Sequence, residues 1–225
     1  MGSFTGRVAE VRTEAGCAAA TIACPGRAVP GPGQYAQASA ATDVLGAALF
    51  YAGEWQGGFL AAPPLPTGWA PGTPLALRGP LGRGFRLPEN LQRLALVAAG
   101  DCLARLLPLA AAALARGAAV TLFTDLPLPP LPASLEAYPL GTLKEALAWA
   151  DFLAVDLPLD DLTGFDERLG LSPGERLPCP GQILLHAPMP CAGLSECGAC
   201  AIRTRRGWKL ACADGPVFDL REIMG

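Results

Sequence analysis

The first part of the chain alternates between polar and apolar positions over short stretches. Residues 7–12 follow the period of a half-buried strand. Gly and Pro residues at 31–33 and 71–74 mark turns, and the second turn leads into another strand candidate at 75–82. Short strands at this spacing are typical of a small antiparallel barrel, so we expect residues 1–90 to form one.

Between residues 91 and 180, apolar runs of strand length alternate with helical stretches. The strand candidates are 94–99, 120–124 and 152–155, and the helix candidates are 103–116, closed by Gly117, and 143–149. This order predicts a parallel sheet with right-handed crossovers. We therefore expect a Rossmann-like α/β domain.

The composition narrows the functional classes. Of 225 residues, 51% are hydrophobic and 16% are charged, which excludes a disordered chain. The net charge is −3 and there is no basic block, which argues against nucleic-acid binding. Six acidic residues and no basic one lie between Asp151 and Glu167, which predicts a solvated face. His186 is the single histidine, so His-rich metal sites are excluded and a solvated loop position is expected for it.

The apolar segments indicate neither membrane insertion nor export. The richest, residues 94–120, is interrupted by Asp101, Arg105 and Arg116, and no run of ~18 uncharged apolar residues occurs. The N-terminal residues carry charges where a signal peptide needs an apolar core. We expect a cytoplasmic protein with no membrane span.

The cysteines fall into a scattered set and a C-terminal group. The scattered ones, expected to be buried and inert thiols, are Cys17, Cys24, Cys102 and Cys179. The group has the spacing C-x5-C-x2-C-x11-C and consists of Cys191, Cys197, Cys200 and Cys212. A [2Fe–2S] cluster needs four thiolates, and plant-type ferredoxins use the related spacing C-x4-C-x2-C before a distant fourth cysteine. Gly193, Gly198 and Ala199 are small enough for backbone N–H groups to approach the sulfurs.

Two other uses of this cysteine group stay open. Structural zinc also takes four cysteines, although zinc ribbons usually present two C-x2-C pairs and this segment has one. Two disulfides would suit an exported protein better. The spacing favours an iron–sulfur cluster over both.

The segment from Cys191 to Asp219, above all C-G-A-C and A-C-A-D-G-P-V-F-D, resembles the cluster domain of the electron-transfer subunit of type B dihydroorotate dehydrogenase, in the ferredoxin reductase-like superfamily. Further similar stretches are G-R-V at 6–8, P-G-Q-Y at 32–35 and R-G-P-L-G-R-G-F at 78–85. The resemblance implies a multidomain α+β fold. Its parts would be a flavin-reductase-type barrel at 1–90, a nicotinamide-nucleotide-type α/β domain at 91–180 and a [2Fe–2S] domain at 181–225.

Both nucleotide sites depart from the motifs of that family. The flavin-binding R-P-x-S motif should follow P-G-Q-Y, but residues 38–45 contain neither Arg nor Pro, so the usual cation for the flavin pyrophosphate is missing. The phosphate loop G-G-G-x-G-x-A-P is replaced at 98–108 by a stretch with one glycine and with Asp101, whose charge would repel a nucleotide. The later C-G-P motif is replaced by residues 155–158. We expect FAD and NAD(H) to bind poorly.

Other residues are candidates to hold a flavin in spite of these departures. Arg78 or Arg83 could supply charge, and Tyr35 or Tyr51 could stack on the isoalloxazine. The competing interpretation is surface arginines and core tyrosines with a polar hydroxyl. Cys102 is expected to be a buried thiol because no base is in view, and no catalytic residue is assigned.

These observations favour a redox subunit rather than a stand-alone enzyme. It would relay electrons through a [2Fe–2S] cluster to or from a flavin-containing catalytic partner, such as a dihydroorotate dehydrogenase-like subunit of pyrimidine biosynthesis, in a hetero-oligomer. One alternative is a complete FAD- and NAD(H)-dependent reductase with non-standard nucleotide sites. Another is a zinc-stabilised, non-catalytic assembly subunit.

Overall fold

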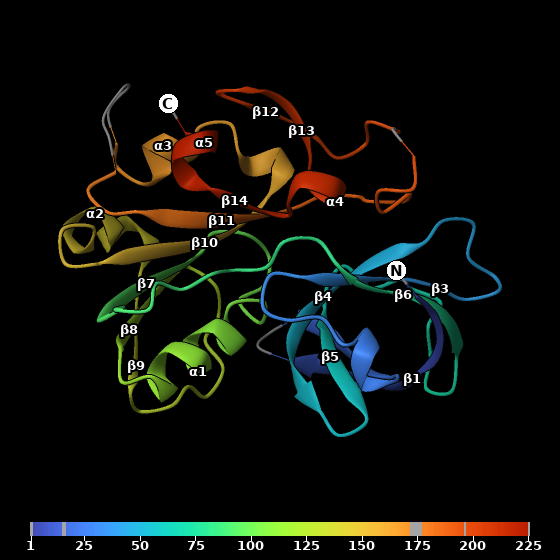
Figure 1. Ribbon diagram of the computed structural model, residues 1–225. Coiled ribbons are helices and arrows are strands. Elements are labelled where there is room, and N and C mark those ends of the chain that lie inside the picture. Colours follow the sequence, from blue (N-terminus) through green and yellow to red (C-terminus); the bar gives the residue numbers. More distant parts are fainter. Residues whose placement is uncertain (1, 15–16, 172–176, 196, 225) are drawn as a thin grey trace.

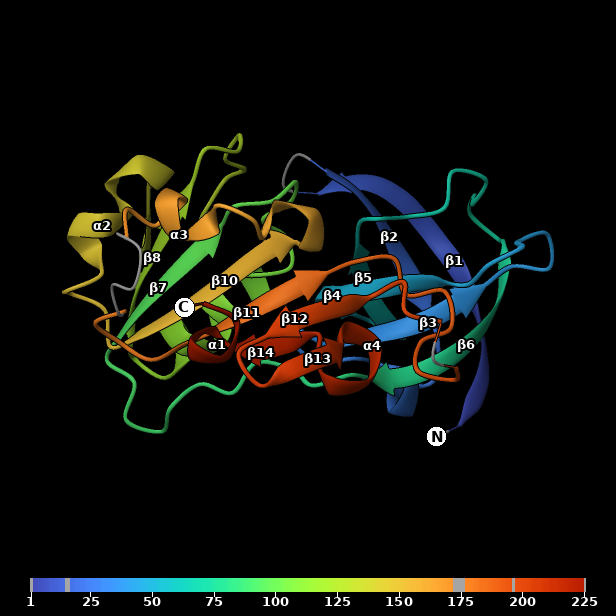
Figure 2. The same cartoon turned by 90° about the horizontal axis from the view of Figure 1, so that it is seen from above.

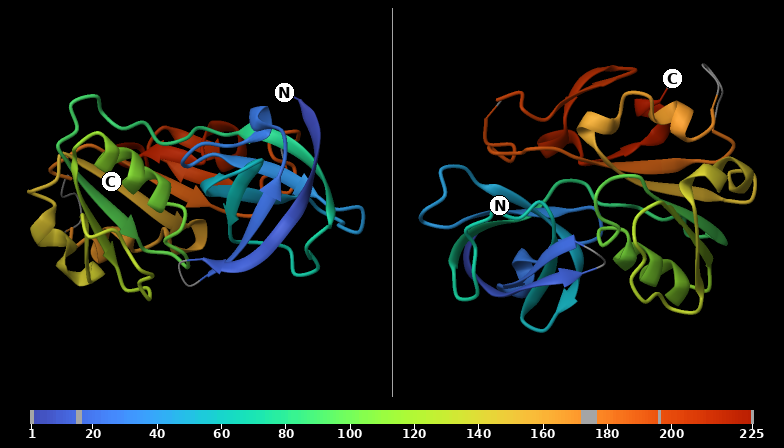
Figure 3. Two further views of the ribbon diagram at one scale, coloured as in Figure 1. Left: turned by 90° about the horizontal axis from the view of Figure 1, so that it is seen from below. Right: turned by 180° about the vertical axis from the view of Figure 1, so that it is seen from behind.

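Two β-structures lie side by side in the computed structural model, which describes residues 2–14, 17–171, 177–195 and 197–224 (Figure 1). The N-terminal one is a closed barrel, and the other is a six-stranded sheet. Seen from behind, the C-terminal segment, coloured red, lies across both of them (Figure 3). The expected succession of an antiparallel barrel and an α/β sheet is confirmed.

The barrel closes in the strand order β1-β2-β5-β4-β3-β6, with neighbouring strands antiparallel. Its elements are β1 (Ser3–Glu14), β2 (Cys17–Ala23), the 3-10 helix η1 (Gly26–Ala28), β3 (Tyr35–Ser39), β4 (Ala47–Trp55), β5 (Gly58–Ala62) and β6 (Pro74–Leu81). β6 buries every second residue, including Leu75 and Leu77, as its sequence pattern predicts. Val8, Ile22 and Phe59 from other strands complete the barrel core.

The sheet has the strand order β14-β11-β10-β7-β8-β9 and is parallel except for β14. Its strands are β7 (Arg93–Ala98), β8 (Ala119–Thr124), β9 (Leu135–Tyr138), β10 (Phe152–Pro158), β11 (Gly181–His186) and β14 (Val217–Asp219). β7 and β10 are buried almost throughout because both faces of the sheet are covered.

Helices supply that cover on the two faces (Figure 1). One face carries α1 (Leu107–Ala115), and the other carries α2 (Leu143–Ala146), α3 (Phe165–Arg168) and α5 (Leu220–Ile223), with the 3-10 helices η2 (Leu140–Thr142) and η3 (Leu159–Asp161) in the connections. In the part of the chain that the structure describes, no helix combines the length and apolar character needed to cross a membrane.

Both predicted helices are shorter in the structure. α1 begins at Leu107 rather than at residue 103, and Pro108 lies in its first turn, where a missing N–H leaves no helix bond unmade. Gly117 follows the helix with a φ of 80°, as expected for a C-terminal cap. α2 covers only the first turn of the predicted 143–149. The strands β2, β4 and β5 were not predicted; alanines and glycines give little strand signal in β2 and β5, whereas the aromatic residues of β4 were a usable signal.

The sheet continues past residue 180. β11 pairs in parallel with β10, and β14 pairs antiparallel with β11. Between them lie the hairpin β12 (Ala201–Thr204) and β13 (Gly207–Leu210), followed by α4 (Ala211–Asp214). The cysteine segment is therefore an insertion between two strands of the sheet, and the domain boundaries at residues 90 and 180 stay predictions.

Two glycines let the barrel approach the C-terminal segment closely. Gly33 and Gly82 have left-handed φ values of 79° and 76°. A Cβ on Gly33 would collide with Val217, and a Cβ on Gly82 would collide with Pro216. Glycine alone combines this backbone conformation with such close packing. The P-G-Q-Y and G-P-L-G stretches thus have a packing reason in this chain.

A disulfide, which the sequence did not predict, joins the barrel to the sheet. Cys17 at the start of β2 is bonded to Cys102 after β7, with Cα atoms 5.9 Å apart across 85 positions of sequence. Their assignment as inert thiols is therefore wrong. Cys24 and Cys179 are free, and Cys179 is buried. Spacing gives no signal for a bond between such distant positions.

Replacing Cys17 or Cys102 with Ser should lower the free energy of unfolding by about 2–4 kcal/mol without reductant, because the bond restricts the unfolded chain. Urea unfolding of the iron-free protein measures the change, and reductant should destabilise the wild type but not the variants. Cys24→Ser is the matched control. Eight titratable thiols, rather than six, in the denatured and unreduced protein would contradict the disulfide.

Candidate metal centre

The four cysteines expected as metal ligands meet beside the barrel as two pairs. Cys191 Sγ lies 3.4 Å from Cys197 Sγ, and Cys200 Sγ accepts a hydrogen bond from the Cys212 backbone N–H at 3.5 Å. The Cys191 and Cys212 thiols also interact electrostatically, which links the two pairs. Among the described residues, no three Cys, His, Asp or Glu side chains gather closely enough for a single metal ion.

The site is buried on one side and open on the other. Cys200 and Cys212 are 1% and 5% exposed and belong to the core of the sheet. Cys191 is half-buried, and Cys197 is exposed. A metal group held by these four thiols would therefore rest against the core and have one edge near the protein surface.

The loop after β11 turns backbone N–H groups toward sulfur. Ala192 and Gly193 have left-handed φ values of 43° and 80°. Hydrogen bonds from the N–H groups of Ser195 and Gly193 are the main cause that lowers the pKa of Cys191 to about 6. Burial raises the pKa of Cys212 to about 12. N–H donors of this kind stabilise negatively charged sulfur, as a thiolate ligand requires.

Polar side chains of the barrel hold the same loop. Arg78 on β6 donates to the carbonyl oxygens of Cys191, at 3.2 Å, and Ala192, at 2.6 Å. Gln37 on β3 donates to the Pro190 carbonyl at 3.1 Å. From above, the loop and α4 lie over this end of the barrel (Figure 2). The barrel is therefore the support on which the cysteine loop rests.

Of the four residues considered as flavin contacts, Tyr35 and Arg78 have hydrogen-bond partners within the chain. Tyr35 is fully buried and donates its hydroxyl to the Cys212 carbonyl at 3.2 Å, and burial raises its pKa. Tyr51 is also buried, so both tyrosines are core residues. Arg83 is exposed, as expected for a surface charge. Arg78 is not a free surface charge, because its guanidinium holds the cysteine loop.

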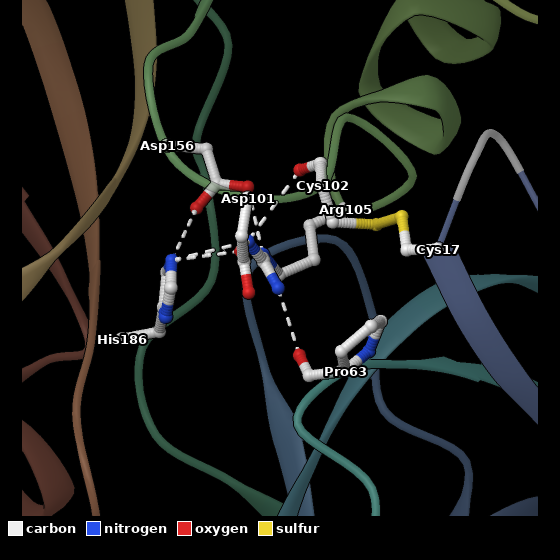
Figure 4. The surroundings of a disulfide bond; sticks show 7 residues. All are labelled: Cys17, Pro63, Asp101, Cys102, Arg105, Asp156 and His186. Carbon is white, nitrogen blue, oxygen red and sulfur yellow. Dashed lines mark hydrogen bonds and ion pairs between the residues drawn. A yellow bond between two sulfur atoms is a disulfide. The ribbon is translucent and has the colours of Figure 1, made fainter. Parts of the chain in front are cut away.

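A second polar group is buried where the parallel strands end (Figure 4). Arg105 has no exposed surface and donates to Asp156 at 2.7 Å and to Asp101 at 2.6 Å. A further N–H of Arg105 reaches the barrel, at the Pro63 carbonyl, 2.7 Å away. Its Nη2 also lies 3.0 Å from His186 Nε2. These side chains, which we call the Arg105 cluster, join the sheet to the barrel.

The Arg105 cluster corrects two expectations. His186 is buried rather than solvated, and Asp156 is fully buried rather than part of a solvated face. Asp101 pairs with Arg105, which also pairs with Asp156, so one guanidinium faces two carboxylates. Sequence analysis missed Arg105 itself. Its spacing of four from Asp101 was a usable signal, whereas Asp156 and His186 lie 51 and 81 positions away.

The protonation states within the cluster follow from its electrostatics. Burial opposes ionisation of Asp101, but Arg105 outweighs it and lowers the pKa of this carboxyl. Burial lowers the pKa of His186, although Asp156 opposes that shift. The imidazole is therefore neutral at neutral pH, and Nε2 accepts a hydrogen bond from Arg105. Asp156 Oδ1 lies 3.5 Å from the same Nε2 and makes no hydrogen bond.

A cavity of about 460 Å³ lies between the start of β4 and the ends of β10 and β11. Its walls are mainly apolar, and the titratable side chains that line it are Asp160 and His186. The pyrophosphate of a dinucleotide needs cationic groups or a helix N-terminus. Among the described residues, no Arg or Lys lines this cavity. The residues present do not fit the pyrophosphate of FAD.

Comparison with known proteins agrees with the motif at the C-terminus. Residues 188–224 match the family model of the iron–sulfur cluster binding domain of dihydroorotate dehydrogenase B. This match covers all four cysteines of the group and identifies the segment as an iron–sulfur cluster-binding one. The resemblance stated from the sequence is confirmed for this segment.

Solved structures share the fold of the whole chain. An NADH-dependent reduced ferredoxin-NADP oxidoreductase has a TM-score of 0.75 at 20% identity, covering 97% of this chain and 89% of that one. A ferredoxin reductase in carbazole 1,9a-dioxygenase gives 0.63 at 17% identity, over 79% and 67% of the chains. Phthalate dioxygenase reductase gives 0.56 at 13% identity, over 98% and 77%. At these identities the similarity shows a ferredoxin reductase-like fold.

Because the chain has one histidine, the pH dependence of the Arg105 cluster is testable. The folded pKa of His186 is lowered, so the unfolded chain binds a proton at higher pH, and the free energy of unfolding should fall as pH drops below about 6.5. His186→Gln should show a smaller fall in urea unfolding of the iron-free protein. Asp101 titrates at lower pH, and the Cys191 thiol, whose pKa is lowered to about 6, contributes the same slope to both proteins. Equal slopes for both proteins would contradict a neutral, buried His186.

Proposed function

We propose, from the match of residues 188–224 to an iron–sulfur cluster binding domain, that this chain is the electron-transfer subunit of a dihydroorotate dehydrogenase-like enzyme of pyrimidine biosynthesis. Its cofactor is a [2Fe–2S] cluster, and its partner is a flavin-containing catalytic subunit. The metal ligands are Cys191, Cys197, Cys200 and Cys212. The chain works as a redox subunit and has no catalytic residues of its own.

The pairing of the thiols is the observation that supports a [2Fe–2S] cluster rather than a zinc ion. Cys191 lies beside Cys197, and Cys200 lies beside Cys212. A [2Fe–2S] cluster has two irons, and each iron takes two protein ligands. Structural zinc would need all four thiols around one ion. Two adjacent pairs on a loop with N–H groups turned toward sulfur support the diiron cluster over zinc.

The protein's part in the proposed relay is to hold and expose the site. When bound, the cluster supplies a one-electron redox centre. The barrel fixes the loop through Arg78 and Gln37, and the core covers Cys200 and Cys212. Cys197 lies at the surface, and Leu194 in the same loop is 75% exposed. This open edge supports docking of a partner here, since electrons cross between centres only over short distances.

The state of the nucleotide sites supports a partner that carries the flavin. Among the residues that the structure describes, none supplies the cavity beside β4 with a cation for pyrophosphate, and the ends of the parallel strands are filled by the Arg105 cluster. In open α/β sheets, those strand ends are the usual place for ligands. In this proposal the units 1–90 and 91–180 serve as a frame, and the unit 181–225 carries the cofactor.

Each of the four ligand cysteines should be required for the cluster. Changing any one to Ala should abolish the visible absorbance and most of the bound iron and destabilise the C-terminal segment, because metal binding is coupled to folding there. Iron and sulfide analysis with visible spectroscopy of anaerobically purified protein measures this. Cys24→Ala and Cys179→Ala are the matched controls, since both thiols are free and lie outside the group. A colourless wild type that holds zinc would overturn the proposal.

The isolated chain should contain iron and sulfide but substoichiometric FAD, and it should bind NADH weakly. Co-expression with a flavin-containing dihydroorotate dehydrogenase subunit should give a hetero-oligomer in which dihydroorotate bleaches the cluster spectrum. Flavin extraction, calorimetric titration with NADH and size-exclusion chromatography measure these outcomes. Stoichiometric FAD together with NADH binding in the micromolar range would favour the complete reductase instead.

A further inference from the structure

The guanidinium of Arg78 reaches from the barrel to the loop that carries Cys191. Its Nη2 donates to two successive carbonyl oxygens, those of Cys191 at 3.2 Å and Ala192 at 2.6 Å. The side chain is half-buried, so these bonds are partly shielded from water. Charge-assisted hydrogen bonds of this kind are stronger than neutral ones, and here they fix the orientation of both peptide groups.

The peptide between Ala192 and Gly193 connects Arg78 to sulfur. A planar trans peptide directs its carbonyl and its N–H to opposite sides. The Ala192 carbonyl meets Arg78. On the other side, the Gly193 N–H stabilises the ionised thiols of both Cys191 and Cys212, which belong to different pairs, and so lowers the pKa of each. Arg78 therefore acts on two of the four sulfurs through one peptide group.

The loop backbone needs support in this orientation. Ala192 and Gly193 are successive left-handed residues, with φ values of 43° and 80°. The left-handed region strains a residue that has a Cβ, so Ala192 stays there only if its surroundings hold it. Ala192 is buried, and Arg78 binds its carbonyl. Without Arg78, this peptide group is free to turn its N–H away from the sulfurs.

We infer that Arg78 is a positioning residue that raises the reduction potential of the cluster, an inference that rests on the function proposed above. Reduction adds negative charge to a group already bound by thiolates. N–H donors to sulfur and a nearby cation therefore favour the reduced form. Arg78 contributes in both ways, since it holds the Gly193 N–H in place and brings a positive charge to the loop.

Two side chains of the barrel serve as matched controls. Gln37 anchors the same loop through the Pro190 carbonyl at 3.1 Å, but it carries no charge. Arg83 carries the same charge as Arg78 just after β6, and it is exposed. Gln37→Leu therefore tests loss of an anchor alone, and Arg83→Gln tests loss of a barrel charge alone.

The experiment is a potentiometric titration of the full chain, loaded with its cluster and followed by visible and electron paramagnetic resonance spectra. Arg78→Gln should change the equilibrium constant for reduction at least tenfold, a shift of about 59 mV to more negative potential for one electron. Arg78→Lys, which keeps the charge but loses the planar fork, should shift the potential in the same direction by less. Gln37→Leu and Arg83→Gln should stay close to the wild type.

Amide hydrogen exchange gives a second measure that does not depend on electron transfer. In Arg78→Gln, the Gly193 amide should exchange faster than in the wild type, whereas amides of the sheet should be unchanged. If Arg78→Gln fails to hold iron, the reduction potential of Arg78→Lys tests the inference instead, because a more negative potential is expected in that variant as well.

Three outcomes would overturn the inference. They are a wild-type potential in Arg78→Gln, a wild-type potential in Arg78→Lys, and an equal shift in Gln37→Leu, which would assign the effect to a loosened loop. A wild-type chain without an iron–sulfur cluster is a separate result, because it removes the proposed function itself. If only the inference fails, the chain still holds its cluster, and the reduction potential stays the same when Arg78 is replaced.

Discussion

A guanidinium without exposed surface must have its charge balanced inside the protein, and the joint between barrel and sheet is built on this constraint. Losing one partner of a buried ion pair leaves an uncompensated charge and costs on the order of 3–5 kcal/mol. Asp156 at the end of β10 and Asp101 after β7 balance Arg105, and Pro63 of the barrel accepts a further N–H. One side chain thus fixes the strand ends of the sheet relative to the barrel. The cysteine loop in turn binds both units, so its geometry depends on that joint.

Arg78 and Arg105 have different structural roles: Arg78 holds the cysteine loop, and Arg105 joins the sheet to the barrel. Arg105 forms ion pairs with two carboxylates, and Nη2 of Arg78 donates hydrogen bonds to two carbonyl oxygens of the cysteine loop. Nε, Nη1 and Nη2 of Arg105 all have partners within the protein, so this guanidinium does not offer a free pair of donors to a pyrophosphate. The charge of Arg105 thus serves the joint between barrel and sheet, and the charge of Arg78 serves the cysteine loop.

The sequence predicted the parts whose signals are local. Alternation identified β1 and β6, apolar runs identified β7, β8 and β10, and cysteine spacing identified a group that the fold brings together as two pairs. Contacts between distant positions could not be predicted in this way. The Cys17–Cys102 bond and the burial of His186 depend on which strand ends the topology places side by side, and the β14–β11 pairing depends on a return of the chain after the cysteine segment. Alanine-rich strands such as β2 were missed because side chains that small fit helices as well as sheets.

The same topology holds the cysteine segment in place without a bound nucleotide. It is inserted between β11 and β14, so both of its ends are fixed by hydrogen bonds of the sheet. Its loop is fixed a third time by the barrel, through Tyr35 on β3 and Arg78 on β6. None of these contacts uses a residue of the Arg105 cluster or requires a ligand in the cavity beside β4. The position of the cysteine loop therefore does not depend on a bound nucleotide, provided that the chain's own side chains keep the barrel and sheet joined. The disulfide and the Arg105 cluster meet that condition here.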